Sequence, residues 1–145
     1  MKRKTSIFLT LCLSLICAFC LFACDRKDKS NLACSLVESS ETRVVISVSE
    51  SGQNCNLLDC MEILKQSKDE DFTYTMSNGM ITSINGIENP ADFSSCWMLY
   101  TSDAEMANTS YATEYDGKTL GSAIVGAGEL EVVADAIYVW VYTTF

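Results

Sequence analysis

Histidine is absent from this chain of 145 residues. Histidine is the side chain that proteins use most often as a general base near neutral pH, and it is the commonest metal ligand. Its absence also excludes nucleophile pairs of the Ser-His and Cys-His types. An enzyme made from this chain would have to work with carboxylates, lysine or tyrosine alone. The sequence therefore predicts a binding protein rather than an enzyme, with no catalytic residue, no cofactor and no metal site.

Positive charge is scarce as well. The chain has 10 lysine and arginine residues against 19 aspartate and glutamate residues, which gives a formal net charge of −9. A surface of this sign repels the phosphate groups of nucleic acids and the anionic headgroups of lipids. This balance argues against a nucleic acid partner.

The N-terminus lacks an apolar run long enough to span a bilayer. Residues 2–4 are basic and residues 7–22 carry no charge, but this stretch is shorter than the roughly 20 residues that a spanning helix needs. The order of basic, apolar and small residues is typical of a secretory signal. The run ends in Leu-Phe-Ala-Cys at residues 21–24. This ending resembles a bacterial lipobox, in which the peptidase cuts before the cysteine and the cysteine thiol carries a diacylglycerol.

The lipobox makes Cys24 the expected site of lipid attachment. Cleavage before Cys24 removes residues 1–23, a lipoprotein signal peptide, with three positive charges, so the formal charge of the mature chain moves from −9 to −12. Two or more lipid chains hold a protein durably on a membrane. We expect an extracytoplasmic protein that is lipid-anchored to the bacterial cell membrane. The alternatives are an uncleaved anchor and an ordinary secreted protein that is cut nearby.

Four cysteines remain after the signal and the lipid site are set aside. They are Cys34, Cys55, Cys60 and Cys96. Outside the cell, four cysteines allow two disulfides in three connectivities. Buried free thiols are the alternative, because cysteine packs well in apolar cores. The sequence leaves both open.

The mature chain divides into a tether and one domain. Residues 25–41 are charged and polar, and a segment of such low hydrophobicity does not offset the entropy of ordering. We therefore expect a flexible tether over residues 24–41 and a single domain over residues 42–145.

The first part of the domain predicts a strand followed by a helix. Apolar and polar residues alternate over residues 42–49, which indicates a half-buried strand. Asn54 or Asn56 is placed to cap a helix that ends near Ser67, with apolar side chains at helical spacing from Leu57 onward. One helix among several strands predicts an α+β fold, in which a single helix packs on one face of a sheet.

The rest of the domain predicts strands. They are expected at residues 72–76, 80–85, 96–100 and 137–142. Asn78-Gly79 predicts a tight hairpin turn, since both positions tolerate positive φ. Residues 101–118 are polar and are expected to form a long loop, with a turn at Asp116-Gly117.

Read in order, the segments at residues 79–86, 96–100 and 137–142 resemble the transcobalamin-like C-terminal domain, a family of bacterial surface domains similar to the β-domain of the cobalamin carriers. The resemblance covers the chain from Thr42 to the C-terminus. It implies a β-grasp-like antiparallel or mixed sheet with one main helix packed on one face. It also implies binding rather than catalysis, with a cobalamin-like small molecule or a protein as the ligand.

The last strand supplies a candidate ligand site. Its side chains alternate between an aliphatic face of Ile137, Val139 and Val141 and an aromatic face of Tyr138, Trp140 and Tyr142. If the aliphatic face covers the helix, the aromatic face lies on the open side of the sheet. Together with Trp97 it would then form a platform for a flat ligand or a partner protein. The alternative is that these rings fill a second core layer under the long loop.

These features predict a lipid-anchored cell-surface binding module. The alternative is a structural or adhesive envelope protein that has no small-molecule ligand.

Overall fold

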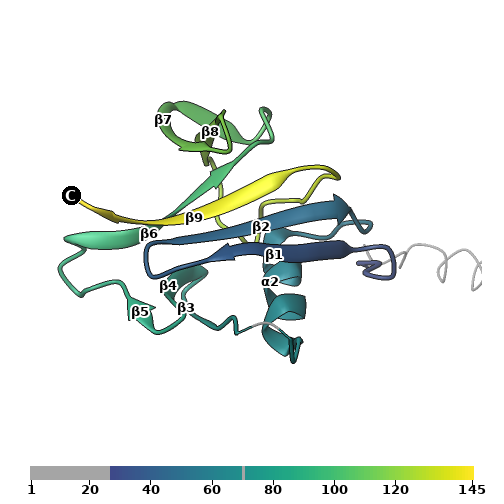
Figure 1. Ribbon diagram of the computed structural model, residues 1–145, viewed down its shortest axis with the longest axis horizontal. Coiled ribbons are helices and arrows are strands. Elements are labelled where there is room, and N and C mark those ends of the chain that lie inside the picture. Colours follow the sequence, from purple (N-terminus) through teal and green to yellow (C-terminus); the bar gives the residue numbers. More distant parts are fainter. Residues whose placement is uncertain (1–26, 70) are drawn as a thin grey trace, which may run out of the picture.

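The computed structural model describes residues 27–69 and 71–145, which contain nine strands and one helix (Figure 1). The expected signal peptide and Cys24 lie outside the described residues. No helix in the described part of the chain has the length and apolar character needed to cross a bilayer.

Six strands form the main sheet, in the order β1-β2-β9-β6-β8-β7. They are β1 (Ala33–Ser39), β2 (Arg43–Glu50), β6 (Ser95–Thr101), β7 (Ala107–Tyr115), β8 (Lys118–Ala123) and β9 (Ile137–Thr144). Each recorded pair of neighbouring strands is antiparallel. The C-terminal strand β9 lies between β2 and β6. Tyr138 of β9 is paired with Ile46 of β2, and Trp140 of β9 is paired with Leu99 of β6. The strands expected from the alternation around residues 42–49, 96–100 and 137–142 are confirmed.

A second sheet is small and consists of β3 (Tyr74–Ser77), β4 (Met80–Ile84) and β5 (Ile87–Glu88). Asn78 and Gly79 have φ values of 52° and 80°, so the expected hairpin turn is confirmed. Asn85 and Gly86 form a second Asn-Gly pair with positive φ at both positions, 49° and 80°. This second turn adds the two-residue strand β5, which no pattern in the sequence predicts.

The helix α2 (Leu57–Gln66) begins directly after its N-cap residue, Asn56. The Asn56 side chain accepts a hydrogen bond from the backbone N–H of Asp59, and the Asp59 carboxylate accepts one from the backbone N–H of Asn56. This reciprocal pair satisfies two N–H groups that a helix N-terminus otherwise leaves without partners. Leu57 and Met61 face the sheet and are fully buried. The expected helix and its end near Ser67 are confirmed, and of the two candidate caps, Asn54 and Asn56, it is Asn56 that caps the helix.

Two expectations about loops are wrong. Ala33–Ser39, placed in the flexible tether, forms β1 and pairs with β2. Its low average hydrophobicity conceals an alternation in which Cys34 and Leu36 pack against the core. The expected long polar loop contains β7, whose residues are polar because this edge strand is largely exposed. The turn at Asp116-Gly117 is confirmed, and it joins β7 to β8.

The main sheet buries side chains on both of its faces. On one face, the helix-side core contains Ile46, Met61, Ile84, Trp97, Tyr138 and Trp140, among other residues of β2, α2, β4, β6 and β9. On the other face, the outer core consists of the buried residues Val45, Tyr100, Leu120 and Val139. Figure 1 shows α2 and the small sheet on one side of β2 and β9, and the hairpin of β7 and β8 curled away on the other.

Candidate functional site

The aromatic face of β9 points toward α2, so the expected platform on the open side of the sheet is wrong. Tyr138 is fully buried and Trp140 is 5% exposed, both in the helix-side core. Val139, between them in the chain, lies in the outer core. The alternation defined the two faces of the strand correctly, but it carried no information about which face the helix covers. The helix side is the deeper layer, and it accommodates the larger rings.

Tyr138 is held in place by a specific hydrogen bond. Its hydroxyl oxygen accepts a hydrogen bond from the backbone N–H of Val133, at 3.0 Å. Burial is the main reason that the pKa of Tyr138 is raised to about 12. The hydroxyl therefore stays protonated near neutral pH, and the ring acts as a packing element of the core.

Trp97 and Tyr142 join the small sheet to the main sheet. The indole Nε1–H of Trp97 donates to the carbonyl oxygen of Ile87 at 2.8 Å, and the hydroxyl of Tyr142 donates to the carbonyl oxygen of Glu88 at 2.9 Å. The two rings also contact each other, with centroids 5.3 Å apart and planes inclined by 58°. Both residues of β5 are thus held by aromatic side chains of β6 and β9.

Trp97 and Trp140 also line a cleft of about 260 Å³ between the start of β4 and strands β6, β8 and β9. We call it the indole cleft. Its other lining residues are Gly79, Met80, Ile81, Met98, Leu99, Ser122, Ala123, Gly126 and Ala127. Two of the four aromatic residues predicted as ligand contacts therefore line one hollow. Tyr138 and Tyr142 are not among its lining residues.

Trp140 differs from Trp97 in its hydrogen bonding. Its Nε1–H is buried and has no acceptor among the described residues. A buried N–H without an acceptor costs about 1–3 kcal/mol. The walls of the indole cleft are mostly apolar, and Met80, which is 52% exposed, is a flexible part of them.

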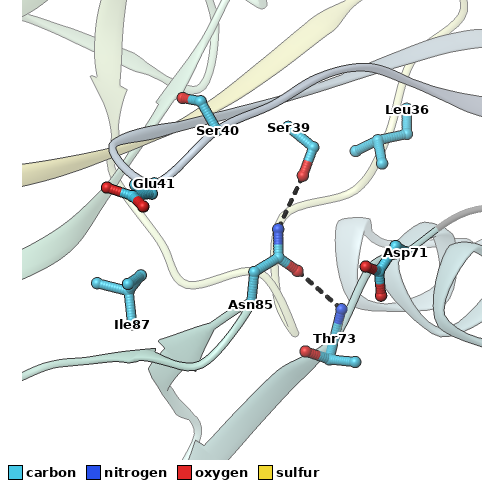
Figure 2. A pocket seen from close by; sticks show the side chains of 8 residues that line it. All are labelled: Leu36, Ser39, Ser40, Glu41, Asp71, Thr73, Asn85 and Ile87. Carbon is cyan, nitrogen blue, oxygen red and sulfur yellow. Dashed lines mark hydrogen bonds between the residues drawn. The ribbon is translucent and has the colours of Figure 1, made fainter.

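A larger hollow, of about 560 Å³, lies between the β1–β2 turn and the small sheet. We call it the polar hollow, and it is lined by Leu36, Ser39, Ser40, Glu41, Asp71, Thr73, Asn85 and Ile87 (Figure 2). Asn85 stands in its centre. The amide of Asn85 donates to the hydroxyl of Ser39 at 2.8 Å and accepts from the backbone N–H of Thr73 at 2.9 Å. Its central amide thus already joins two parts of the fold, which favours a structural role for this hollow.

Asp59 connects the N-terminal segment to α2. Its two carboxylate oxygens each lie 2.8 Å from an ammonium nitrogen, one of Lys27 and one of Lys29. Burial acts to raise the pKa of Asp59. The hydrogen bonds from Lys27 and Lys29, and from the backbone N–H of Asn56, outweigh this effect and lower the pKa to about 2. The hydrogen bond between Lys29 and Asp59 also raises the pKa of the Lys29 ammonium group.

The four cysteines lie in different surroundings, and no sulfur is bonded to another in this structure. Cys34 on β1 and Cys60 on α2 are in contact, and the thiol of Cys34 is 3.7 Å from the carbonyl oxygen of Cys60. Cys55 is buried and its thiol donates to the carbonyl oxygen of Asp28 at 3.4 Å. Cys96 lies near the start of β6. Within residues 27–69 and 71–145, no group of three or more histidine, cysteine, aspartate or glutamate side chains is arranged to hold a metal ion.

No family model, curated protein or solved structure matches this chain.

Proposed function

We propose that this protein is a lipid-anchored binding module of the bacterial cell surface and that its ligand site is the indole cleft. One observation carries the proposal: two tryptophans from separate strands line the same apolar hollow, and one of them has a buried N–H for which the described residues supply no acceptor. Ligand sites are typically concave and mostly apolar, with a few polar groups that fix the orientation of the ligand.

The chemistry of the cleft defines the kind of ligand. Its volume of about 260 Å³ lies just below the range of about 300–1,000 Å³ that is common for drug-sized ligands. The walls favour a compact, uncharged, apolar molecule. A hydrogen-bond acceptor on that molecule would satisfy the Nε1–H of Trp140. A flat heterocycle of one or two rings has these properties.

The resemblance to the transcobalamin-like C-terminal domain belongs to the same proposal, and with it a β-grasp-like description of the fold. A whole corrinoid is larger than the indole cleft. A cobalamin-like ligand would therefore place only one part in the cleft and leave its bulk outside.

Titration of the purified protein tests the proposal. The probes are benzimidazole, which is a flat acceptor of suitable size, and cyanocobalamin. The readout is the NMR signal of the Trp140 indole N–H, assigned with a Trp140→Phe variant. We expect benzimidazole to shift this signal in a saturable way. In the Trp140→Phe variant, where the indole N–H signal of Trp97 reports binding instead, we expect affinity to fall about tenfold, the effect of losing one hydrogen bond of about 1.4 kcal/mol.

Two matched variants locate the binding. Ala123→Leu narrows the indole cleft, whereas Ser40→Leu narrows the polar hollow. We expect only Ala123→Leu to abolish the shift. If neither probe shifts the Trp140 signal at millimolar concentration, or if Ser40→Leu is the variant that abolishes binding, the assignment of the site is wrong.

The second candidate is a structural or adhesive envelope protein. It is favoured by the edge strand β7, where Tyr111 is 66% exposed. An exposed edge strand can pair with a further strand from another chain. Sedimentation of the purified protein tests this candidate. A concentration-dependent dimer that Thr113→Lys on β7 disperses would support it, and a monomer at all concentrations would argue against self-association through β7.

A further inference from the structure

We propose that Cys34 and Cys60 form a disulfide bond that fastens strand β1 to helix α2. The thiol of Cys34 lies 3.7 Å from the carbonyl oxygen of Cys60, and both residues belong to the helix-side core. The sequence left the pairing of the four cysteines open, and this contact selects the pair Cys34 and Cys60. The inference is independent of the ligand proposed for the indole cleft.

Both cysteines are held by regular secondary structure. Cys60 lies within α2 and is fully buried, next to Met61. Cys34 is half-buried on β1, where it is paired with Val48 of β2. Figure 1 shows β1 crossing in front of α2, so the two elements that carry the cysteines lie side by side. A disulfide needs α-carbons within about 7 Å of each other and side chains that point toward each other. The packing of β1 on α2 brings both side chains into one core.

The two thiols perturb each other, which gives them different roles. A hydrogen bond with the Cys60 side chain lowers the pKa of Cys34, and the same contact, followed by burial, raises the pKa of Cys60. Cys34 is also the more exposed of the two. Because the thiolate is the nucleophile in disulfide exchange, Cys34 is the residue that reacts first.

The oxidant is the disulfide of an extracytoplasmic thiol oxidant or of oxidised glutathione. The Cys34 thiolate attacks one sulfur of that disulfide, which forms a mixed disulfide and releases the first oxidant thiolate. Cys60 then loses its proton and attacks the sulfur of Cys34, which releases the second thiolate. The two electrons from the cysteine pair thereby reduce the oxidant to two thiols, and the two protons given up by Cys34 and Cys60 protonate them.

The other two cysteines remain thiols. Cys55 uses its S–H group in a hydrogen bond to the carbonyl oxygen of Asp28. Cys96 lies on β6, and burial alone raises its pKa. A higher pKa lowers the thiolate fraction and slows disulfide exchange.

Peptide mapping of the full chain, exported with its own signal and purified without reductant, tests the pairing. The protein is alkylated in denaturant, digested and analysed by mass spectrometry. We expect alkylation of Cys55 and Cys96 only, together with a peptide that links Cys34 to Cys60 and lacks two hydrogens. Addition of reductant before alkylation should label all four. Alkylation of all four without reductant, or a linked peptide with another pairing, would overturn the proposal.

Two variants give a second readout. Cys34→Ser and Cys96→Ser each remove one thiol, but only the first removes the proposed bond. Reductant should lower the melting temperature of the wild type and of Cys96→Ser by several degrees and leave that of Cys34→Ser unchanged. Treatment of the reduced full chain with oxidised glutathione should restore the same linked peptide. This oxidation with glutathione keeps the test valid if the chain is not exported. Formation of any other cysteine pair in that experiment would count against the proposal.

Discussion

The two faces of the main sheet differ in what covers them. On one face, α2 and the small sheet cover the helix-side core, which includes Tyr138 and Trp140. On the other face, a hairpin of two strands covers an outer core that contains four buried residues within the described part of the chain, Val139 among them. Adjacent residues of one strand thus belong to two layers of unequal depth. The difference indicates that the helix-side core contributes most of the stability of the fold. It also indicates that the hairpin of β7 and β8 can open while the helix-side core stays folded.

The largest effect is expected from two neighbouring substitutions on β9. Tyr138→Ala should lower the free energy of unfolding by about 3–5 kcal/mol, because it empties a fully buried site of the helix-side core. Val139→Ala removes two buried carbons from the outer core and should cost about 2 kcal/mol. Urea unfolding followed by circular dichroism measures both. Equal losses, or a larger loss for Val139→Ala, would contradict the comparison.

Acid should weaken the helix side through Asp59. The pKa of Asp59 is about 2 in the folded protein, below the ordinary value of 3.8. The stability that Asp59 contributes is therefore fully present above about pH 4, and it is lost as the pH falls from about 4 to about 2. The expected loss is about 2 kcal/mol, somewhat less if solvent screens the two half-exposed lysines.

Comparison with Asp59→Asn isolates this contribution from those of other carboxylates. The variant should be less stable than the wild type at pH 6, and the difference should shrink toward pH 2 in urea unfolding. A difference that stays constant across this range would show that the ion pairs of Lys27 and Lys29 with Asp59 contribute nothing measurable.

A smaller and local effect is expected at Gly121 of β8. A β-carbon at this position would lie 2.9 Å from the β-carbon of Ala107 and 3.0 Å from backbone atoms of Asn108, both on β7. Gly121→Ala should therefore push β7 outward, at a cost of about 1 kcal/mol, since an edge strand can give way. Hydrogen exchange should show faster exchange of the amides of β7 and β8 and unchanged exchange in β2 and α2. Faster exchange throughout the sheet would mean that the hairpin is not an independent unit.

Short-range signals in the sequence predicted the elements that depend on them. The cap at Asn56, the turn at Asn78-Gly79 and the alternation along β9 each act within a few residues, and each is present. The edge strands β1 and β7 were missed because they are polar or only half-buried. An edge strand gains its order from pairing with a neighbour, and its own composition need not indicate a strand.

The candidate site was predictable only in part, because it depends on contacts between residues that are far apart in the sequence. Trp97 and Trp140 could be selected as aromatic residues on strands, but their orientation depended on which face α2 covers. Met80 and Ala123 line the indole cleft with them. These two residues lie 43 positions apart in the chain, and no local pattern connects them. The contact between Cys34 and Cys60 likewise depends on the packing of β1 on α2.

The smallest effect is expected at Tyr111, the most exposed aromatic residue in the hairpin of β7 and β8. Its ring is 66% exposed, and it stands where the register of β7 with β8 is interrupted between Asn108 and Ala112. Tyr111→Ser should change the free energy of unfolding by less than about 0.5 kcal/mol, because it removes no buried contact. If the substitution costs more than 1 kcal/mol in the same urea assay, the ring is buried in solution by a second copy of the chain. The outer face would then be an interface rather than the weaker half of the sheet, and the loss should grow with protein concentration.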